Sequence, residues 1–148
     1  MKLTRASGYA LQALAFLASR DGGDPVTSQH MAEADDSPDR FLLKVLRPLV
    51  AAGLLRSLKG PHGGYRLARP AERITLLEIL EAAGGPIRGE APQLDNEAGR
   101  PLDARLQAVC DQAAGHARKP FERIRLSELV APHGAAARRG QGSKRQGG

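Results

Sequence analysis

Residues 37–68 decide the fold, and they read SPDRFLLKVLRPLVAAGLLRSLKGPHGGYRLA. Their first third predicts a helix, with Ser37 as its N-cap and Pro38 in the first helical position, where the missing N–H costs nothing. At about 100° per residue, one side of this helix collects the apolar residues Phe41, Leu42, Val45, Leu46 and Leu49. The opposite side collects the cations Arg40, Lys44 and Arg47. The helix can therefore pack with one side and present three positive charges on the other. We expect Pro48 to kink or end it near Arg47.

The second half of the stretch predicts a β-hairpin, with strands at 54–58 and 65–68. The turn between them, residues 59–64, contains three glycines, which allow it to approach another backbone closely. Lys59 and His62 in this turn can contact phosphate or the minor groove of DNA. A nucleotide-binding loop is disfavoured, because the turn does not begin a helix and lacks the Gly-Lys-Ser/Thr ending.

Two further helices are expected before this stretch. Thr4 can cap a helix over residues 4–20. A short helix follows from Thr27 or Ser28, since either hydroxyl can accept a free backbone N–H. Residues 35–37 then form a turn of the length that separates the two helices of a helix-turn-helix. The pattern predicts a mainly α fold with a small β-hairpin, arranged as a winged helix-turn-helix domain.

The sequence after the hairpin predicts a helix that lacks a partner. A capping box at residues 75–78 opens a fourth helix, and residues 86–100 are expected to form a loop. The next helix is expected at 101–118, where Lys119-Pro120 breaks or bends it, and a short amphipathic element follows at 124–130. The apolar stripe of the helix at 101–118 consists of Leu102, Leu106, Val109 and Ala113. We expect this stripe to pack against a second copy of the chain, although folding back onto its own domain is an alternative. In a dimer, two recognition helices would lie about 34 Å apart, one turn of DNA.

These elements divide the chain into three expected parts. Residues 1–85 form the winged helix-turn-helix DNA-binding domain, and residues 86–131 form the loop and the long C-terminal dimerisation helix. Residues 132–148 contain Arg138, Arg139, Lys144 and Arg145, no acid and almost nothing to bury. Such a composition predicts a disordered basic tail.

The distribution of charge points to a polyanionic partner. The chain of 148 residues has a formal net charge of +6. Between residues 40 and 71 there is no acid, but there are seven basic residues: Arg40, Lys44, Arg47, Arg56, Lys59, Arg66 and Arg69. A stretch this basic within a folded domain favours nucleic acid, with a merely solvated basic face as the alternative. No apolar run approaches the roughly 18 residues that span a bilayer, and no signal-peptide pattern is present, so we expect a cytoplasmic protein.

Catalysis is not expected. The four histidines, His30, His62, His116 and His133, are scattered along the chain. They form no Cys-His or Ser-His-Asp arrangement, and no paired carboxylates mark a cleft. The single cysteine, Cys110, excludes an intrachain disulfide framework. We therefore predict a binding protein and not an enzyme.

Several motifs together resemble the Rrf2 family of transcriptional regulators over about residues 1–130. The most specific of them is the run Gly60-Pro61-His62-Gly63-Gly64-Tyr65-Arg66-Leu67-Ala68. The others are Met1-Lys2-Leu3-Thr4, Gly8-Tyr9-Ala10, Pro25-Val26-Thr27 and Gly53-Leu54-Leu55. The resemblance implies a dimeric winged-helix repressor or activator, with a long C-terminal helix crossing between subunits. It also implies DNA contacts from the start of the second helix, the start of the recognition helix and the wing. Carried over by position, these residues are Thr27, Ser28, Asp39, Arg40, Lys44, Lys59 and His62, to which the outward side of the helix adds Arg47.

The chain departs from many members of the family at the sensor. Those members hold an iron–sulfur cluster with three closely spaced cysteines between the fourth helix and the dimer helix, but residues 86–103 contain no cysteine here. Because a cluster needs several converging ligands, we expect no cofactor and no metal, as in the branch of the family that lacks these cysteines. An intersubunit metal or cluster site is the less favoured alternative. Cys110 is a candidate redox residue, although a lone cysteine on a helix is more often a small buried apolar residue.

Two functional hypotheses follow. The first is a sequence-specific DNA-binding regulator, with a repressor preferred, that acts as a homodimer on a double-stranded operator. The second is a redox- or ligand-responsive interaction module with weak or lost DNA binding. The effector is unknown in both, and no membrane partner is expected.

Overall fold

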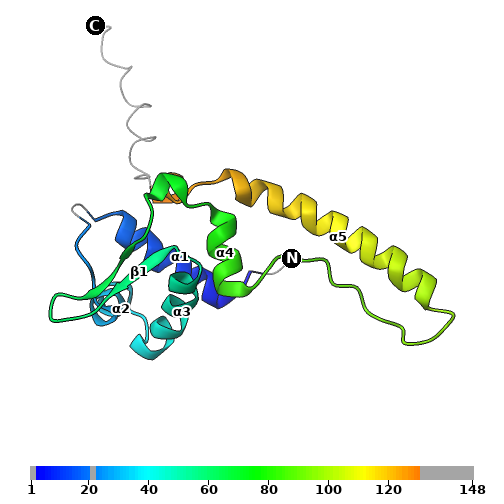
Figure 1. Ribbon diagram of the computed structural model, residues 1–148, viewed down its shortest axis with the longest axis horizontal. Coiled ribbons are helices and arrows are strands. Elements are labelled where there is room, and N and C mark those ends of the chain that lie inside the picture. Colours follow the sequence, from blue (N-terminus) through cyan, green and yellow to red (C-terminus); the bar gives the residue numbers. More distant parts are fainter. Residues whose placement is uncertain (1–2, 21–22, 131–148) are drawn as a thin grey trace, which may run out of the picture.

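The computed structural model describes residues 3–20 and 23–130, so the predicted tail at 132–148 lies outside the described part. The helices are α1 (Arg5–Ala18), α2 (Ser28–Asp35), α3 (Asp39–Ala51), α4 (Leu76–Gly84), α5 (Arg100–Arg123) and α6 (Leu126–Val130) (Figure 1). The strands β1 (Leu55–Leu58) and β2 (Gly64–Leu67) form an antiparallel hairpin. A short 3₁₀ turn, Ala71–Arg73, joins the hairpin to α4. The predicted fold class, mainly α with a small β-hairpin, is confirmed. Within the described ranges, no helix has the length and apolar character needed to cross a bilayer.

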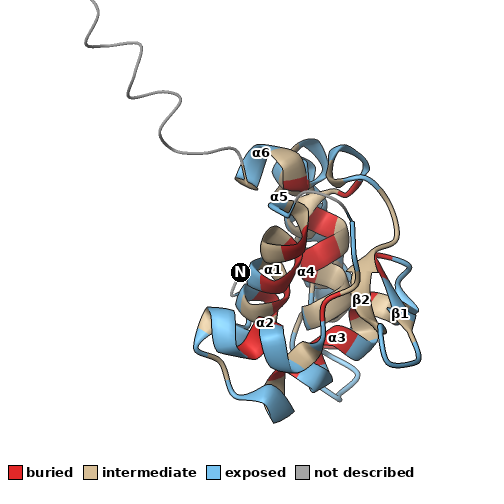
Figure 2. Ribbon diagram, turned by 90° about the vertical axis from the view of Figure 1, so that its left-hand side faces the viewer, coloured by how far each residue is buried: buried red, intermediate tan, exposed pale blue. Residues whose placement is uncertain are grey.

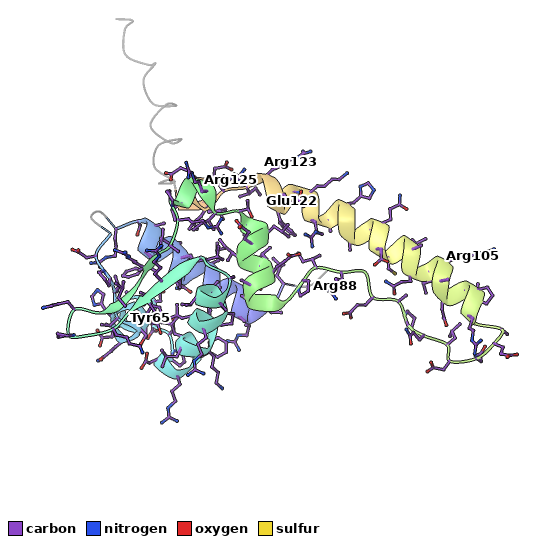
Figure 3. All side chains as sticks on the ribbon, in the orientation of Figure 1. Tyr65, Arg88, Arg105, Glu122, Arg123 and Arg125 are labelled. Carbon is purple, nitrogen blue, oxygen red and sulfur yellow. The ribbon has the colours of Figure 1, made fainter. Side chains whose placement is uncertain are left out.

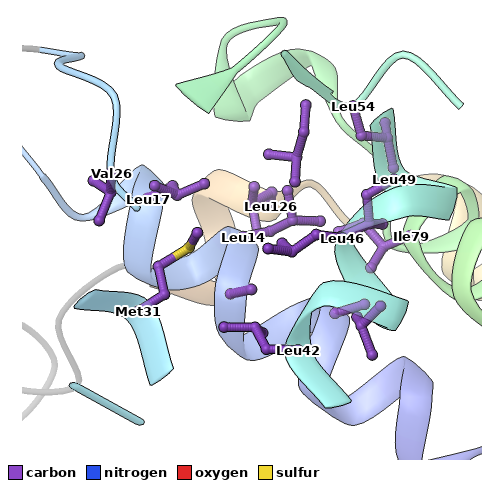
Figure 4. Close-up of a cluster of buried hydrophobic side chains, with 14 of the residues drawn as sticks. Leu14, Leu17, Val26, Met31, Leu42, Leu46, Leu49, Leu54, Ile79 and Leu126 are labelled. Carbon is purple, nitrogen blue, oxygen red and sulfur yellow. The ribbon is translucent and has the colours of Figure 1, made fainter. Parts of the chain in front are cut away.

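An aliphatic core holds α1, α3 and α4 together (Figure 4). Leu14 of α1, Leu46 and Leu49 of α3, and Ile79 of α4 are all fully buried. Met31 extends this core to α2. The buried residues of these helices lie on the sides that face one another, whereas half of α2 and the turn of the hairpin are exposed and β2 is half-buried (Figure 2).

The chain leaves this core along residues 85–99, between α4 and α5, and returns to it along α5 and into α6 (Figure 1). Leu126 is fully buried within the same cluster as Leu14 and Leu46. Its N–H donates a hydrogen bond to the Ile74 carbonyl at 2.8 Å, and the Leu76 N–H donates to the Ile124 carbonyl at 2.9 Å. Residues 124–126 are thus fixed beside the start of α4, and α5 projects away from the body of the molecule (Figure 1).

Side chains cap three of the helices as the sequence predicts. The Thr4 hydroxyl accepts the Ser7 N–H at 3.2 Å. Of the two candidates at the second helix, Thr27 is the cap, because its hydroxyl accepts the His30 N–H at 3.2 Å. At α4 both halves of the capping box are present: Thr75 accepts the Glu78 N–H, and the Glu78 carboxylate accepts the Thr75 N–H.

The start of α3 differs from the prediction by one residue. Pro38 is the N-cap and is not helical (φ −64°, ψ 122°), and Ser37 provides no cap but donates a hydrogen bond to the Asp35 carbonyl. Asp36 takes a left-handed conformation that ends α2. Pro38 is therefore extended and α3 begins at Asp39. The α conformation is disfavoured for the residue before a proline, so Ser37 is a poor position from which to start the helix.

The two prolines do not end their helices, so that part of the prediction was wrong. Pro48 lies inside α3, which continues to Ala51, and Pro120 lies inside α5, which continues to Arg123. Each proline removes one hydrogen bond to the carbonyl four residues earlier, at Lys44 and His116. Both of those residues are exposed, so water can satisfy the carbonyl and the helix need not end.

Candidate nucleic-acid interface

Arg40, Lys44 and Arg47 are all exposed on one side of α3, which we call the cationic face. The opposite side of the helix is buried through Leu42, Val45, Leu46 and Leu49. Asp39, the first residue of α3, is also exposed. The helix is thus anchored by its apolar side and presents its cations outward, as the periodicity predicted.

A pair of hydrogen bonds joins the start of α2 to the base of the hairpin. The Val26 N–H donates to the Tyr65 carbonyl at 2.9 Å, and the Tyr65 N–H donates to the Val26 carbonyl at 2.8 Å. Figure 3 shows Tyr65 on the hairpin, on the same side of the molecule as α2. Thr27 and Ser28 follow Val26 directly, so the first turn of α2 is fixed beside the wing. The Thr27 hydroxyl accepts an N–H and keeps its own proton free to donate.

Glycines at the end of the hairpin turn permit two close backbone contacts, one of them with the start of α2. Gly64 has φ +143°, and a Cβ added there would lie 2.5 Å from the Val26 carbonyl oxygen. A Cβ at Gly63 would lie 2.2 Å from the Leu58 carbonyl oxygen, within the hairpin itself. Two of the three turn glycines predicted to permit contact with another backbone therefore serve contacts within this chain, whereas nothing lies within 4 Å of a Cβ added at Gly60.

Lys59 and His62 are exposed in the hairpin turn. The structure thus brings the predicted DNA-binding residues onto three neighbouring elements: the start of α2, the exposed side of α3 and the turn of the wing. All of them are exposed except Ser28, which is half-buried. Their contacts with DNA remain a prediction.

Sequence reasoning counted Arg56 and Arg66 among the basic residues but did not place them in the site. The strand register sets Arg56 directly opposite Arg66. Alternation along the strands is the signal that could have placed them, because Leu55 faces the core and its neighbour Arg56 faces away.

Cys110 lies on α5 and is half-buried. It borders a hollow of about 700 Å³ between the start of α1, the end of α4 and the middle of α5. The segment before α5 is fixed along the helix by Gln107, which donates to the Gly89 carbonyl at 2.6 Å and accepts the Ala91 N–H at 3.2 Å. In the ranges that the structure describes, no three His, Cys, Asp or Glu residues are grouped to hold a metal ion. One thiol does not supply the ligands of an iron–sulfur cluster, so the residues of this chain do not fit that group.

A recognition helix followed by a β-hairpin and preceded by a short helix defines a DNA-binding protein of the winged helix-turn-helix class. Comparison with known proteins identifies the family. The family model Rrf2, described as an iron-dependent transcriptional regulator, matches residues 3–132. The chain therefore belongs to the Rrf2 family, whose members are transcriptional regulators and not enzymes.

Individual relatives agree with this assignment. The chain is 34% identical over 131 residues to a putative regulator of Rhodobacter capsulatus described as rrf2-like, which covers 86% of this chain and 84% of the relative. It is 39% identical over 84 residues to the regulator IscR of Cereibacter sphaeroides, over 55% of this chain and about half (54%) of that protein. Among solved structures, CymR, described as the global cysteine regulator of Bacillus subtilis, superimposes with a TM-score of 0.68 at 23% identity. That match covers 88% of this chain and 96% of CymR, and it supports the fold.

Proposed function

We propose that this protein is a sequence-specific transcriptional repressor that binds a double-stranded operator as a homodimer in the cytoplasm, without an iron–sulfur cluster. The observation that carries the proposal is the exposed cationic face of α3, a helix that contacts both α2 and β1 of the wing. An α-helix fits the major groove of B-DNA, where arginine and lysine reach the O6 and N7 acceptors of guanine.

Each predicted residue has a role in this proposal. Arg40 and Lys44 contact guanine edges or nearby phosphates, and Arg47 contacts the backbone. Asp39 can accept a hydrogen bond from the N4 amino group of cytosine. Two further groups position the protein: Thr27 and Ser28 bind a phosphate at the first turn of α2, and Lys59 and His62 contact the backbone or minor groove from the wing.

Exposed apolar residues on α5 support the homodimer. This helix has 24 residues and none of them is buried. The predicted stripe is exposed in the single chain, with Leu102 at 58%, Leu106 at 43% and Val109 at 61% of their full areas. Together with Pro92 and Leu94, these side chains line an apolar groove of about 390 Å³. A contiguous apolar surface of this kind marks an interface, and a self-complementary helix stripe suits a two-fold axis.

We assign a separate function to each of the three parts of the chain. Residues 1–85 bind DNA, residues 86–131 form the loop and dimerisation helix, and the basic residues of 132–148 add nonspecific attraction. Leu126 lies in the core of the DNA-binding part, so the end of α5 is rigidly connected to that part. A change at the dimer helix can therefore alter the spacing of the two recognition helices.

Selection of bound fragments from the protein's own genome, followed by titration at several salt concentrations, tests the proposal. A regulator gives a selected operator with two related half-sites and an affinity that falls steeply with salt, by about 0.9 log units per log unit of salt for each neutralised phosphate. A reporter placed behind the operator then distinguishes repression from activation. The second hypothesis, a redox- or ligand-responsive module that involves Cys110, predicts weak binding of every duplex.

A further inference from the structure

The outer face of the hairpin carries two arginines with the same charge directly opposite each other. In the antiparallel register, Leu55 pairs with Leu67 and Arg56 pairs with Arg66. Leu55 is buried against the core, so alternation places the arginine pair on the outward face. Like charges directly opposite each other destabilise a hairpin. The fold alone therefore gains nothing from this pair.

No acid forms an ion pair with either arginine within the described residues. Neither Arg56 nor Arg66 forms an ion pair there, whereas Arg69, which follows β2, pairs with Glu78 at 2.8 Å. Arg66 also borders a small hollow near Asp24 and Glu72, but neither carboxylate lies within ion-pair distance of it. The two guanidinium groups are thus available to an anion from outside the chain.

The arginine pair adjoins the cationic face of α3. Arg56, Arg66 and Arg69 line a shallow hollow of about 610 Å³, whose other wall includes Val50 near the end of α3. Val50 lies one turn beyond Arg47 on the helix, on the flank of the cationic face. Positive charge therefore continues from α3 across this hollow onto the hairpin.

We propose that Arg56 and Arg66 bind backbone phosphates of DNA that flank the bases contacted by α3. This proposal rests on the DNA-binding function proposed above and adds a second contact surface to it. The planar guanidinium matches the oxygens of a phosphate with two parallel hydrogen bonds, and an exposed, shallow hollow suits a backbone better than a base. The hairpin lies at the end of the molecule opposite the free end of α5 (Figure 1), so these phosphates lie on the outer side of each half-site.

The test compares the double variant Arg56→Gln/Arg66→Gln with the wild-type chain on a selected operator and on a random duplex of equal length. We expect the variant to lose affinity by the same factor on both duplexes, because phosphates carry no sequence information. The salt slope becomes shallower by about 0.9 for each phosphate that is no longer neutralised, at least about 1.8 for the pair. When salt rises from roughly 50 to 200 mM, the ratio of the wild-type affinity to the variant affinity then falls by a factor of at least about twelve. The melting temperature without DNA stays the same or rises, since a repulsion has been removed.

The double variant Arg123→Gln/Arg125→Gln is the matched control. It removes the same charge from exposed positions near the junction of α5 and α6, on the opposite side of the molecule from α2 and α3 (Figure 3). It should change the salt slope far less than the hairpin variant does.

Three results would overturn the inference. One is an unchanged slope in the hairpin variant, and the second is a loss of affinity that accompanies a lowered melting temperature. The third is stabilisation of the wild type, but not of the variant, by inorganic phosphate while DNA binding stays unaffected, which would assign the pair to a free phosphorylated ligand. If the wild type binds neither duplex, the proposed function itself fails.

Discussion

Arg40 stands where the recognition helix begins, and its exposure gives it access to base edges in the proposed complex. A bidentate contact between arginine and guanine contributes roughly 1–3 kcal/mol of discrimination against a wrong base. Nonspecific binding depends instead on the total number of phosphate contacts. The two kinds of binding therefore respond differently to the removal of this one side chain.

We predict that Arg40→Ala weakens binding to the selected operator by about 10- to 100-fold and binding to random DNA by much less. Competition titrations with the two duplexes measure this difference. Arg123→Ala, at an exposed position near the end of α5, is the control for the removal of one charge. Equal losses on both duplexes would assign Arg40 to the backbone.

At position 64, the backbone conformation and a close contact both require glycine. Its φ of +143° and the 2.5 Å approach of an added Cβ to the Val26 carbonyl oxygen both disfavour any side chain. We predict that Gly64→Ala destabilises the protein by more than about 1 kcal/mol and weakens DNA binding, because the wing and the start of α2 separate. Gly8→Ala is the contrast, since nothing lies within 4 Å of its added Cβ and alanine favours a helix. Thermal unfolding of the two variants should shift in opposite directions, and equal shifts would contradict the role given to Gly64.

At the scale of elements, two hydroxyl caps and the two faces of α3 were predictable from sequence, whereas two features were not. The hydroxyl caps at Thr4 and Thr75 and the two faces of α3 follow from local chemistry within a few residues. The continuation of α3 through Pro48 does not, because it depends on where the freed carbonyl meets water. The link between Val26 and Tyr65 joins segments 39 residues apart (65 − 26), and only the tertiary structure reveals it.

The capping box of α4 makes stability depend on pH. Partial burial raises the pKa of Glu78, but hydrogen bonds from Thr75 and Arg69 and the Arg69 charge outweigh it and hold the pKa below its ordinary value of 4.5. A carboxylate with a lowered pKa adds stability that is complete above the unfolded pKa and is lost as pH falls through the folded one.

We therefore predict that Glu78→Gln lowers stability at pH 7 by less than about 1 kcal/mol, because this side chain is 40% exposed and screened by solvent. Below pH 4.5, the stability of the wild type should decline more steeply than that of the variant. Melting temperatures measured from pH 7 down to acid conditions test this, with the exposed Glu122→Gln as control. Parallel curves for wild type and Glu78→Gln would contradict the assignment.

At the scale of the whole molecule, the apolar stripe of α5 has no partner within the described part of the chain. The sequence predicted that this helix lacks a partner, and the exposed stripe is consistent with that. The sequence could not predict that α6 returns to the core, since Leu126 belongs to a short segment whose burial depends on Ile74 and Leu76 at the start of α4.

We predict that Leu106→Glu converts the protein to a monomer while leaving its fold intact, since Leu106 is already 43% exposed in the single chain. Ala104→Glu introduces the same charge on the opposite side of α5 and should leave the dimer unchanged. Sedimentation equilibrium of the two variants measures the difference. A Leu106→Glu variant that remains dimeric would show that the interface lies elsewhere.

The central claim is that the cationic face of α3 meets DNA. The most direct measurement is the salt slope and operator selectivity of the triple variant Arg40→Gln/Lys44→Gln/Arg47→Gln, compared with those of the wild type. An unchanged melting temperature of the variant first shows that it is folded. We predict that the variant loses its preference for the operator over random DNA and that its salt slope becomes shallower, by about 0.9 for each phosphate that is no longer neutralised. A triple variant that binds the operator with unchanged affinity, selectivity and slope would contradict the account.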